Sequence, residues 1–325
     1  MKAAVLHELG KVPRCEDFAE PTAGKDEAVV RVRSASLKAI DKQLASGSHY
    51  ASPRELPVVC GTDGVGDLED GTRVFFGGPR RPYGAMAERT VVPRAFCFPV
   101  PSGLDDDRAA ALPNPGVSAW LSLTQRAKLA PGETVLILGA TGGIGQLAVQ
   151  MAKLLGARRV IGAGRNERML STLSELGADA TIQLDQPQDS LKDAFARAAG
   201  DQGFDVIIDY LWGRPTEALL AAITKSEFAA VTKETRLVQA GESAGPTISL
   251  PAAVLRSTAL TILGTAGIPP REVLVEAMQQ VMARAARGEL RIETERVPLA
   301  EIARVWQRQG QSGRRIVVTP LAGRG

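Results

Sequence analysis

Closely spaced glycines after an apolar run are the feature of this 325-residue chain most directly suited to chemistry. The run Val135–Gly145 places an expected strand before the glycines and a helix after them. Glycine lets a phosphate approach the backbone closely, and the helix N-terminus adds free N–H groups and a positive dipole end. The motif predicts a dinucleotide-binding loop, with a glycine-rich turn that binds nothing as the alternative. The candidate contacts are Gly139, Thr141, Gly142, Gly143, Ile144 and Gly145.

The end of the next expected strand indicates which dinucleotide would bind. An NAD-dependent enzyme usually has Asp or Glu roughly 20 residues after the loop, where the carboxylate binds the ribose 2′-hydroxyl. This chain has Gly164 followed by Arg165 there. Glycine leaves room for a 2′-phosphate, and arginine can hold it with a forked, charge-assisted pair of hydrogen bonds. We therefore predict NADP(H) as the cofactor. The alternative is that Arg165 is a solvated loop residue, and Arg168 is a weaker second candidate.

The secondary-structure elements that must position these residues change along the chain from mainly strands to alternating strands and helices. The first part is β-rich, with expected strands separated by Gly and Pro. From about Leu129 strands alternate with helices, which predicts a parallel sheet covered on both faces. The expected strands are Lys2–Leu6, Val29–Arg33, Arg73–Phe76, Ala85–Val92, Thr134–Leu138, Arg159–Ala163, Thr181–Leu184, Phe204–Asp209, Arg236–Ala240, Thr258–Leu263 and Arg315–Thr319. The expected helices are Leu147–Leu155, Met169–Leu176, Glu272–Arg287 and Leu299–Gln309.

Composition excludes several classes of protein. Charged residues make up 23% of the chain with a net charge of +3, and both signs are interspersed, which argues against a nucleic-acid-binding stripe. The three cysteines are far apart, which argues against a disulfide scaffold. No segment has the roughly 20 apolar residues of a membrane helix, and the start is too short in apolar residues for a signal peptide. We expect a cytoplasmic protein that acts on a small molecule.

Several short motifs resemble those of the medium-chain dehydrogenases and reductases, in the same order and at similar spacing. In chain order they are Gly71–Val74, Gly84–Glu88, Val91–Pro93, Ala109–Pro113, Ser118–Leu121 and Pro131–Leu136. The resemblance covers nearly the whole chain and is strongest to the zinc-free quinone oxidoreductase branch, which includes the zeta-crystallins.

The resemblance implies an α/β fold in which a Rossmann domain is inserted into a GroES-like, β-rich catalytic domain. Residues 115–266 would form the doubly wound parallel sheet, and residues 1–114 and 267–325 the catalytic domain. It also implies a homodimer, paired through the strand Thr258–Leu263, whose apolar edge would otherwise be exposed. By family position, the cofactor would also lie along Tyr210, Gly241 and Ala266, although an aromatic residue such as Tyr210 is more often a packing residue.

Zinc-dependent relatives bind their catalytic zinc with Cys, His and Cys at three separated positions. Those positions fall here on Lys38, Thr62 and Asn114. A catalytic zinc site takes its protein ligands from His, Cys or carboxylate residues, and none of these types is present. We therefore predict that the protein has no metal site.

Without a metal, an acceptor that is already electron-poor is the easiest to reduce. The resemblance therefore implies NADPH-dependent hydride transfer to a quinone or another α,β-unsaturated carbonyl. The candidate catalytic residues are Lys38, Tyr50 and Asn114. Lys38 could polarise a carbonyl or hold the nicotinamide ribose, or be a solvated lysine, and Tyr50 could donate to a substrate oxygen or pack at the rim. The alternative functions are an enoyl or alkenal reductase with a specific substrate, and a non-catalytic NADPH-binding protein.

Overall fold

The protein divides into two compact units in the computed structural model, which describes residues 1–224, 233–265, 267, 269–308 and 313–320. The split unit comprises Met1–Asn114 and Met278–Gly325, and the central unit comprises Pro115–Ala277. The first division lies between Asn114 and Pro115. The second falls within helix α9 (Arg271–Ala286), later than the expected boundary after Ala266.

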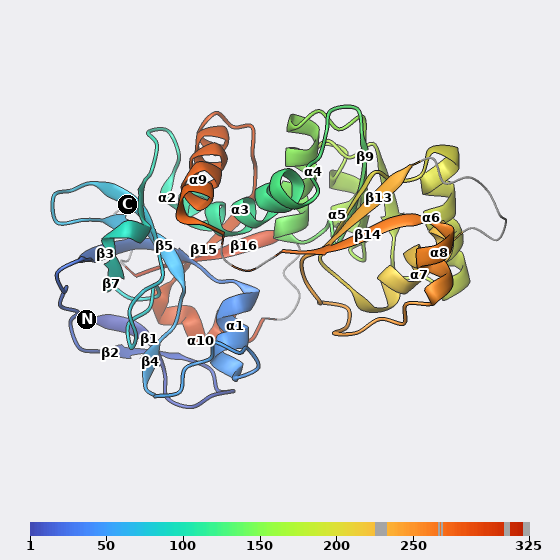
Figure 1. Ribbon diagram of the computed structural model, residues 1–325. Coiled ribbons are helices and arrows are strands. Elements are labelled where there is room, and N and C mark those ends of the chain that lie inside the picture. The colour runs from blue at the N-terminus through green and yellow to red at the C-terminus, as the bar shows by residue number, and fades with distance from the viewer. Residues whose placement is uncertain (225–232, 266, 268, 309–312, 321–325) are drawn as a thin grey trace. The chain divides into compact units, whose positions relative to one another are not determined.

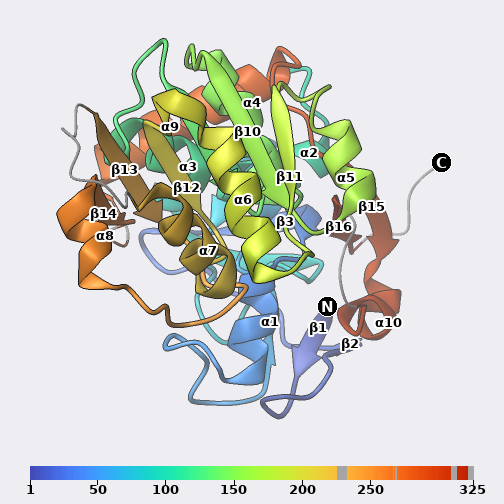
Figure 2. The same ribbon diagram turned by 90° about the vertical axis from the view of Figure 1, so that its right-hand side faces the viewer.

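The central unit is built on a six-stranded parallel sheet (Figure 2). Its order is β11-β10-β9-β12-β13-β14, so the chain runs outward from β9 in one direction and then returns to β12 on the other side. This reversal is the switch point at which open α/β sheets bind ligands, beyond the carboxyl ends of the strands. The strands are β9 (Thr134–Leu138), β10 (Arg159–Gly164), β11 (Ala180–Gln183), β12 (Val206–Asp209), β13 (Glu234–Gln239) and β14 (Ala259–Gly264).

Helices cover both faces of this sheet because its strands are apolar on both sides. Leu136 and Ile161 pack with the helical residues Phe195 and Leu219 on one face. On the other face Gly162 lies against Leu173, which follows α5. The helices of this unit are α4 (Gly143–Leu154), α5 (Glu167–Thr172), α6 (Gln188–Ala199), α7 (Gly213–Ile223) and α8 (Ala252–Ser257). The expected doubly wound fold is confirmed.

The split unit is β-rich, and its longest strand joins the two ends of the chain. Strand β3 (Glu27–Ser36) pairs with β5 and β7 from the first segment and with β16 from the last. Figure 1 shows β16 beside β15, with which it pairs in parallel. The strands are β1 (Lys2–Leu6), β2 (Arg14–Asp17), β4 (Val58–Val59), β5 (Asp63–Asp67), β6 (Arg73–Gly77), β7 (Arg89–Pro93), β8 (Cys97–Pro99), β15 (Glu293–Pro298) and β16 (Arg314–Thr319).

The core of the split unit mixes residues from both segments. Val30 and Phe76 from the first segment pack with Val305 and Ile316 from the last. The strand Arg314–Thr319 therefore returns to the first domain, as predicted. The helices described are α1 (Ala39–Ser46), α2 (Asp106–Ala111), α3 (Pro113–Leu121), α9 and α10 (Ile302–Trp306), of which α3 and α9 cross the divisions between the units.

Several expected elements are shorter than predicted, among them the strand Phe204–Asp209, which begins at Val206, and the helix Met169–Leu176, which ends at Thr172. The strand expected over Ala85–Val92 begins only at Arg89, because the backbone of Ala85 and Met86 bonds instead to Gly61, Cys60 and Ala4. The helix expected over Leu299–Gln309 is a 3-10 turn, Leu299–Glu301, followed by α10; Gln309 lies outside the described residues. Across the described ranges, none of the helices has the length and apolar character needed to span a bilayer.

Candidate active site

The glycine-rich loop follows β9 and is held tightly against the start of α4. Gly139 has φ +86°, a conformation that favours glycine. A Cβ on Gly145 would lie 2.2 Å from the carbonyl oxygen of Gly139, so α4 can pack on the loop only with glycine at that position. The two glycines therefore bring the end of β9 and the first turn of α4 together.

The first turn of α4 offers its backbone N–H groups without a side-chain cap. Gly142 is the N-cap residue, and no side chain caps the helix. The first N–H groups of any helix have no intrahelical partner, and they carry the positive end of the helix dipole. A Cβ on Gly142 would meet only the Gly139 oxygen, at an ordinary 3.4 Å. Gly143 and Ile144 are partly exposed, so the space before this turn suits a phosphate.

The structure gives a reason for glycine at position 164, at the end of β10, that the sequence did not suggest. A Cβ there would lie 2.4 Å from Cγ2 and 2.6 Å from Oγ1 of Thr141. The close approach of the Thr141 side chain by itself requires glycine here, and the expectation that Gly164 leaves room for a phosphate stays a prediction. Thr141 and Gly164 lock the loop after β9 to the end of β10.

Arg165 is the first residue after β10, and its side chain is exposed. The next residue, Asn166, caps α5 by accepting a hydrogen bond from the Met169 N–H at 3.1 Å. Among the described residues Arg165 forms no ion pair. Its guanidinium therefore stands unneutralised at the same edge of the sheet as the glycine-rich loop.

The loop after β12 is fastened by one buried carboxylate. One oxygen of Asp209 accepts from the backbone N–H groups of Leu211 at 2.8 Å and Trp212 at 2.9 Å. The other accepts from the Thr216 hydroxyl at 2.5 Å. Trp212 has φ +56°, which is unusual for a residue with a side chain, and this network holds it there.

Tyr210 and Gly241, two further cofactor candidates of the central unit, lie in the loops after β12 and β13. Tyr210 is buried, which favours the packing alternative for its ring. A Cβ on Gly241 would lie 3.0 Å from the Tyr210 carbonyl oxygen, so glycine allows the loops after β12 and β13 to approach. Ala266 lies outside the described residues.

In the split unit, Lys38 is the centre of a buried ion cluster. Its side chain is 4% exposed, and its Nζ donates to Asp63 Oδ1 at 2.8 Å and to the Ser36 carbonyl oxygen at 3.0 Å. Asp41 lies 3.4 Å from the same ammonium. Burial acts to lower the pKa of Lys38, but the carboxylates of Asp41 and Asp63 outweigh it and raise that pKa above its ordinary value. Lys38 is thus neither solvated nor free to reach a ligand.

The cluster joins two of the three positions where zinc-dependent relatives have ligands, Lys38 and Thr62. Asp41 Oδ1 accepts from both the backbone N–H and the hydroxyl of Thr62, each at 3.1 Å. Lys38 and Thr62 are therefore joined through Asp41, whereas Asn114 is exposed. Within the described residues, no group of three or more His, Cys, Asp or Glu side chains is arranged to hold a metal ion.

Tyr50 is almost fully in solvent. Its side chain is 98% exposed, and its ring lies against that of His49 with centroids 4.2 Å apart. The structure therefore does not bring Tyr50 to Lys38. The residues of the Lys38 cluster that line a pocket are Asp41 and Thr62.

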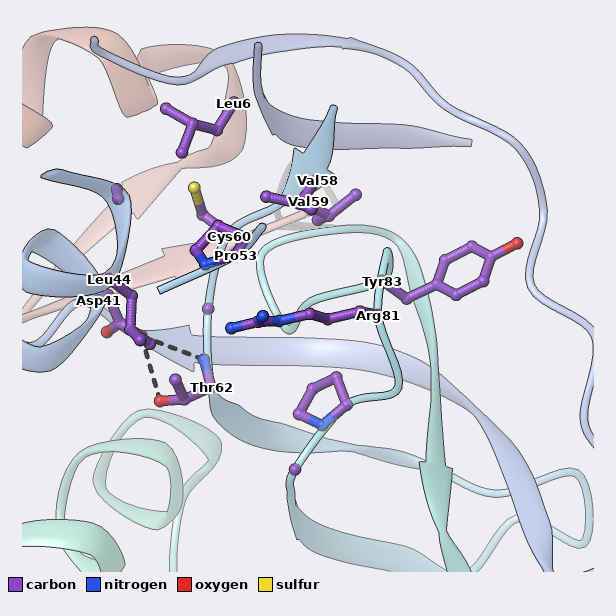
Figure 3. Close-up of a pocket in the computed structure, with 14 residues that line it drawn as sticks. Leu6, Asp41, Leu44, Pro53, Val58, Val59, Cys60, Thr62, Arg81 and Tyr83 are labelled. Atoms are coloured by element: carbon purple, nitrogen blue, oxygen red, sulfur yellow. Dashed lines mark hydrogen bonds between the residues drawn. The ribbon is translucent and has the colours of Figure 1, made fainter. Parts of the chain in front are cut away.

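That pocket, about 170 Å³ in volume, lies within the split unit (Figure 3). Its walls are mostly apolar, and its polar groups are Asp41, Thr62, Arg81 and Tyr83. In Figure 3 the Arg81 side chain extends across the pocket, whereas the Tyr83 ring points away from it. Cys60 also lines the pocket, and burial strongly raises the pKa of its thiol, which keeps it protonated. The arrangement suits a small, largely apolar molecule.

Comparison with known proteins places this architecture in a family. Residues 143–286 match the model of the zinc-binding dehydrogenase family, a range that excludes positions 38, 62 and 114. A quinone oxidoreductase-like protein 2 homolog of Nematostella vectensis is 30% identical over 265 residues, which are 78% of this chain and 69% of that protein. The chain belongs to the quinone oxidoreductase branch of the medium-chain dehydrogenases and reductases.

Two further proteins, one of them with a solved structure, are also similar to this chain. The quinone oxidoreductase of Thermus thermophilus, solved also with NADPH, has 30% identity and a TM-score of 0.79; the match covers 98% of this chain and 100% of that one. The NADPH-dependent alkenal/one oxidoreductase of Arabidopsis thaliana chloroplasts is 28% identical over 64% of this chain and 57% of its own length. An oxidoreductase of the medium-chain type is thus the class of this protein.

The contacts that sequence analysis missed are those between distant segments. Asp63 lies 25 residues after Lys38, and nothing local pairs them. Arg81 stands in a loop rich in Gly, Pro and Arg, where no single residue is marked. The one signal available was Asp41, three residues after Lys38 and on the same helical turn, where a carboxylate can reach a neighbouring cation.

Proposed function

We propose that this protein is an NADPH-dependent reductase of a quinone or another α,β-unsaturated carbonyl. The observation that carries the cofactor assignment is the end of β10. Arg165 is exposed and without an ion pair among the described residues, beside a loop that fits a phosphate, and no carboxylate stands where an NAD enzyme has one. The relative solved with NADPH supports this assignment.

The central unit would hold the dinucleotide by its phosphates. The N–H groups of Gly143, Ile144 and Gly145 in the first turn of α4 would face the pyrophosphate, and Arg165 the 2′-phosphate. When bound, the dinucleotide supplies a hydride to the acceptor. Gly139 and Gly164 act indirectly, because they set the path of the backbone that makes these contacts.

The acceptor class follows from the side chains at positions 38, 62 and 114. Lys, Thr and Asn are not a zinc ligand set, so the acceptor must be polarised by its own conjugation. The names of the relatives, a quinone oxidoreductase-like protein and an alkenal/one oxidoreductase, agree with such acceptors. We expect elemental analysis of the purified protein to find no stoichiometric zinc.

Lys38 has a positioning role in this proposal. Its ammonium is engaged by Asp63 and Ser36, and it fixes Asp41, which in turn orients the Thr62 hydroxyl at the pocket. Thr62 is then the group of this cluster that reaches the ligand. Tyr50 and Asn114 remain candidates for contact with the acceptor, each with an exposed side chain.

Cofactor titrations test the proposal most directly. Charge-assisted hydrogen bonds contribute roughly 1.5–3 kcal/mol, so Arg165→Ala should weaken NADPH binding about tenfold to a hundredfold. NADH binding should change little, because NADH lacks the 2′-phosphate. Arg197→Ala is the control, an exposed arginine in the last turn of α6 that should leave both constants almost unchanged. Equal losses for NADPH and NADH in Arg165→Ala, or a wild type that prefers NADH, would contradict the assignment.

Turnover separates the candidate functions. We expect NADPH oxidation with members of a panel of quinones and enones. Tight NADPH binding without oxidation by any of them would favour the non-catalytic alternative. Activity confined to one 2-enoyl or alkenal substrate would favour the narrower enzyme.

A homodimer through β14 is also part of the proposal. Among the described strands β14 ends the six-stranded sheet, and Leu260, Ile262 and Leu263 on it are only partly buried. An apolar strand edge invites pairing with another chain. Light scattering at micromolar concentration should therefore give the mass of two chains, and a single-chain mass would count against the interface.

A further inference from the structure

Arg81 places a cation without an acidic partner in the pocket of the split unit. The guanidinium donates to the carbonyl oxygen of Ala51 at 2.5 Å and to that of Ser52 at 3.5 Å. Within the described part of the chain it forms no ion pair with a carboxylate. A guanidinium carries five N–H donors in a planar fork, so donors remain after these two contacts.

The other polar groups of the pocket are already engaged. Asp41 accepts from Thr62, and the two buried carboxylates Asp41 and Asp63 are matched by two cations, Lys38 and Arg315. Tyr83 donates its phenol to the Glu20 carbonyl oxygen at 3.1 Å, away from the pocket. Arg81 is therefore the charged group of this pocket whose charge is left unbalanced.

The charged residues next to the pocket do not cancel the positive charge of Arg81. A second pocket, about 700 Å³ in volume, shares Val58 and Arg81 with the first and adds Arg54 and Glu55. Its charged side chains are thus two cations and one anion. Arg54 and Glu55 carry opposite charges, so the net positive charge of this second pocket is that of Arg81.

The size of the first pocket limits what it can hold. A cavity of about 150 Å³ in another protein binds benzene, and this pocket is about 170 Å³. Its apolar walls include Leu6, Leu44 and Val59. One small ring or a short unsaturated chain would fill it, with a charged end beside the guanidinium.

We propose that Arg81 is a specificity-determining residue that selects an acceptor carrying a carboxylate or another anionic group. The inference rests on the proposed function, because it assigns the substrate class of that reaction. A guanidinium fixed by two backbone carbonyls binds a carboxylate through parallel, charge-assisted hydrogen bonds with little loss of side-chain freedom. The acceptor would be a small enone or quinone acid.

The test uses one acid and its methyl ester, which differ in charge and have the same reactive alkene. With 4-oxo-2-pentenoate, hydride from NADPH adds to one alkene carbon and water supplies a proton to the other, giving 4-oxopentanoate and NADP⁺. We expect kcat/KM of the wild type to favour the acid. Arg81→Gln should lower kcat/KM for the acid about tenfold to a hundredfold and that for the ester less than about threefold. Arg81→Lys should keep part of the preference, because it keeps the charge without the fork.

Controls separate specificity from a structural role. Arg54→Gln removes an exposed cation that lines the second pocket and not the first, and should change the acid-to-ester ratio little. Equal losses for acid and ester in Arg81→Gln would mean that Arg81 only supports the loop at Ala51 and Ser52. A wild type that prefers the ester would also overturn the inference.

A failure of the proposed function would look different. In that case no quinone or enone, charged or neutral, would oxidise NADPH. The inference would then be judged by equilibrium binding of 4-oxopentanoate and its methyl ester to the wild type and Arg81→Gln. Tighter binding of the acid, lost in Arg81→Gln, would support it, and equal binding of the acid and the ester would overturn it.

Discussion

The two units build their sites by opposite means. The central unit uses backbone: the loop after β9 depends on side chains that are absent at Gly139, Gly145 and Gly164. The split unit uses side chains, since Lys38 and Asp63 meet as buried charges from distant parts of the chain. A site formed by the backbone depends on residues that are close together in the sequence. A site formed by side chains from distant segments exists only in the folded chain.

The largest expected effect lies in the buried ion cluster. Lys38→Met would leave the carboxylates of Asp41 and Asp63 buried without their cation, which should lower the free energy of unfolding by about 3–5 kcal/mol. Chemical denaturation measures this. The double variant Lys38→Met/Asp63→Asn should recover part of the loss, because it removes one of the unpaired charges. Lys25→Met, at an exposed lysine, is the control. A loss below about 1 kcal/mol in Lys38→Met would mean that the cluster is solvated.

A smaller effect is expected at the backbone site. In Gly145→Ala the new Cβ would lie 2.2 Å from the Gly139 oxygen, so the loop must shift, at a cost of about 1–3 kcal/mol of stability. NADPH affinity should fall as well, because the same shift moves the first turn of α4. The matched control for stability is Gly142→Ala, whose Cβ would make one ordinary contact at 3.4 Å. Similar losses of stability in the two alanine variants, measured by denaturation, would show that packing on the loop is not what requires glycine.

The smallest effect concerns pH. The pKa of Lys38 is raised in the folded state, so its contribution to stability is complete below the ordinary lysine value of 10.5 and is lost as pH rises through the folded value. Asp41, Asp63 and Arg315 are the charged groups that act on it. Above about pH 10.5 the unfolding free energy of the wild type should therefore fall more steeply than that of Lys38→Met/Asp63→Asn. Parallel curves for the two proteins would show that Lys38 is not strongly coupled to these carboxylates.

The same contrast explains what could be predicted from the sequence. The doubly wound sheet and its glycine loop were predictable, because apolar periodicity and glycine spacing are local signals. The reason for Gly164 was not, since Thr141 reaches it only when β9 and β10 are paired. Lys38 was expected to contact a carbonyl or the ribose, or to be solvated, and its burial against Asp63 could not be predicted because the two residues are distant in the sequence. The role proposed for Arg81 depends on a pocket that several segments of the chain form together, and no sequence pattern predicts that pocket.

The pairing of β16 with β3 has a consequence for how the protein is made. Val317 lies opposite Ser36, so the sheet of the split unit needs residues from both ends of the chain. During synthesis the whole central unit, Pro115–Ala277, is translated before β16. The central unit can therefore fold while its host is still incomplete, with one side of β3 waiting for its last neighbour. A strand translated after the central unit thus completes the sheet that an earlier segment began.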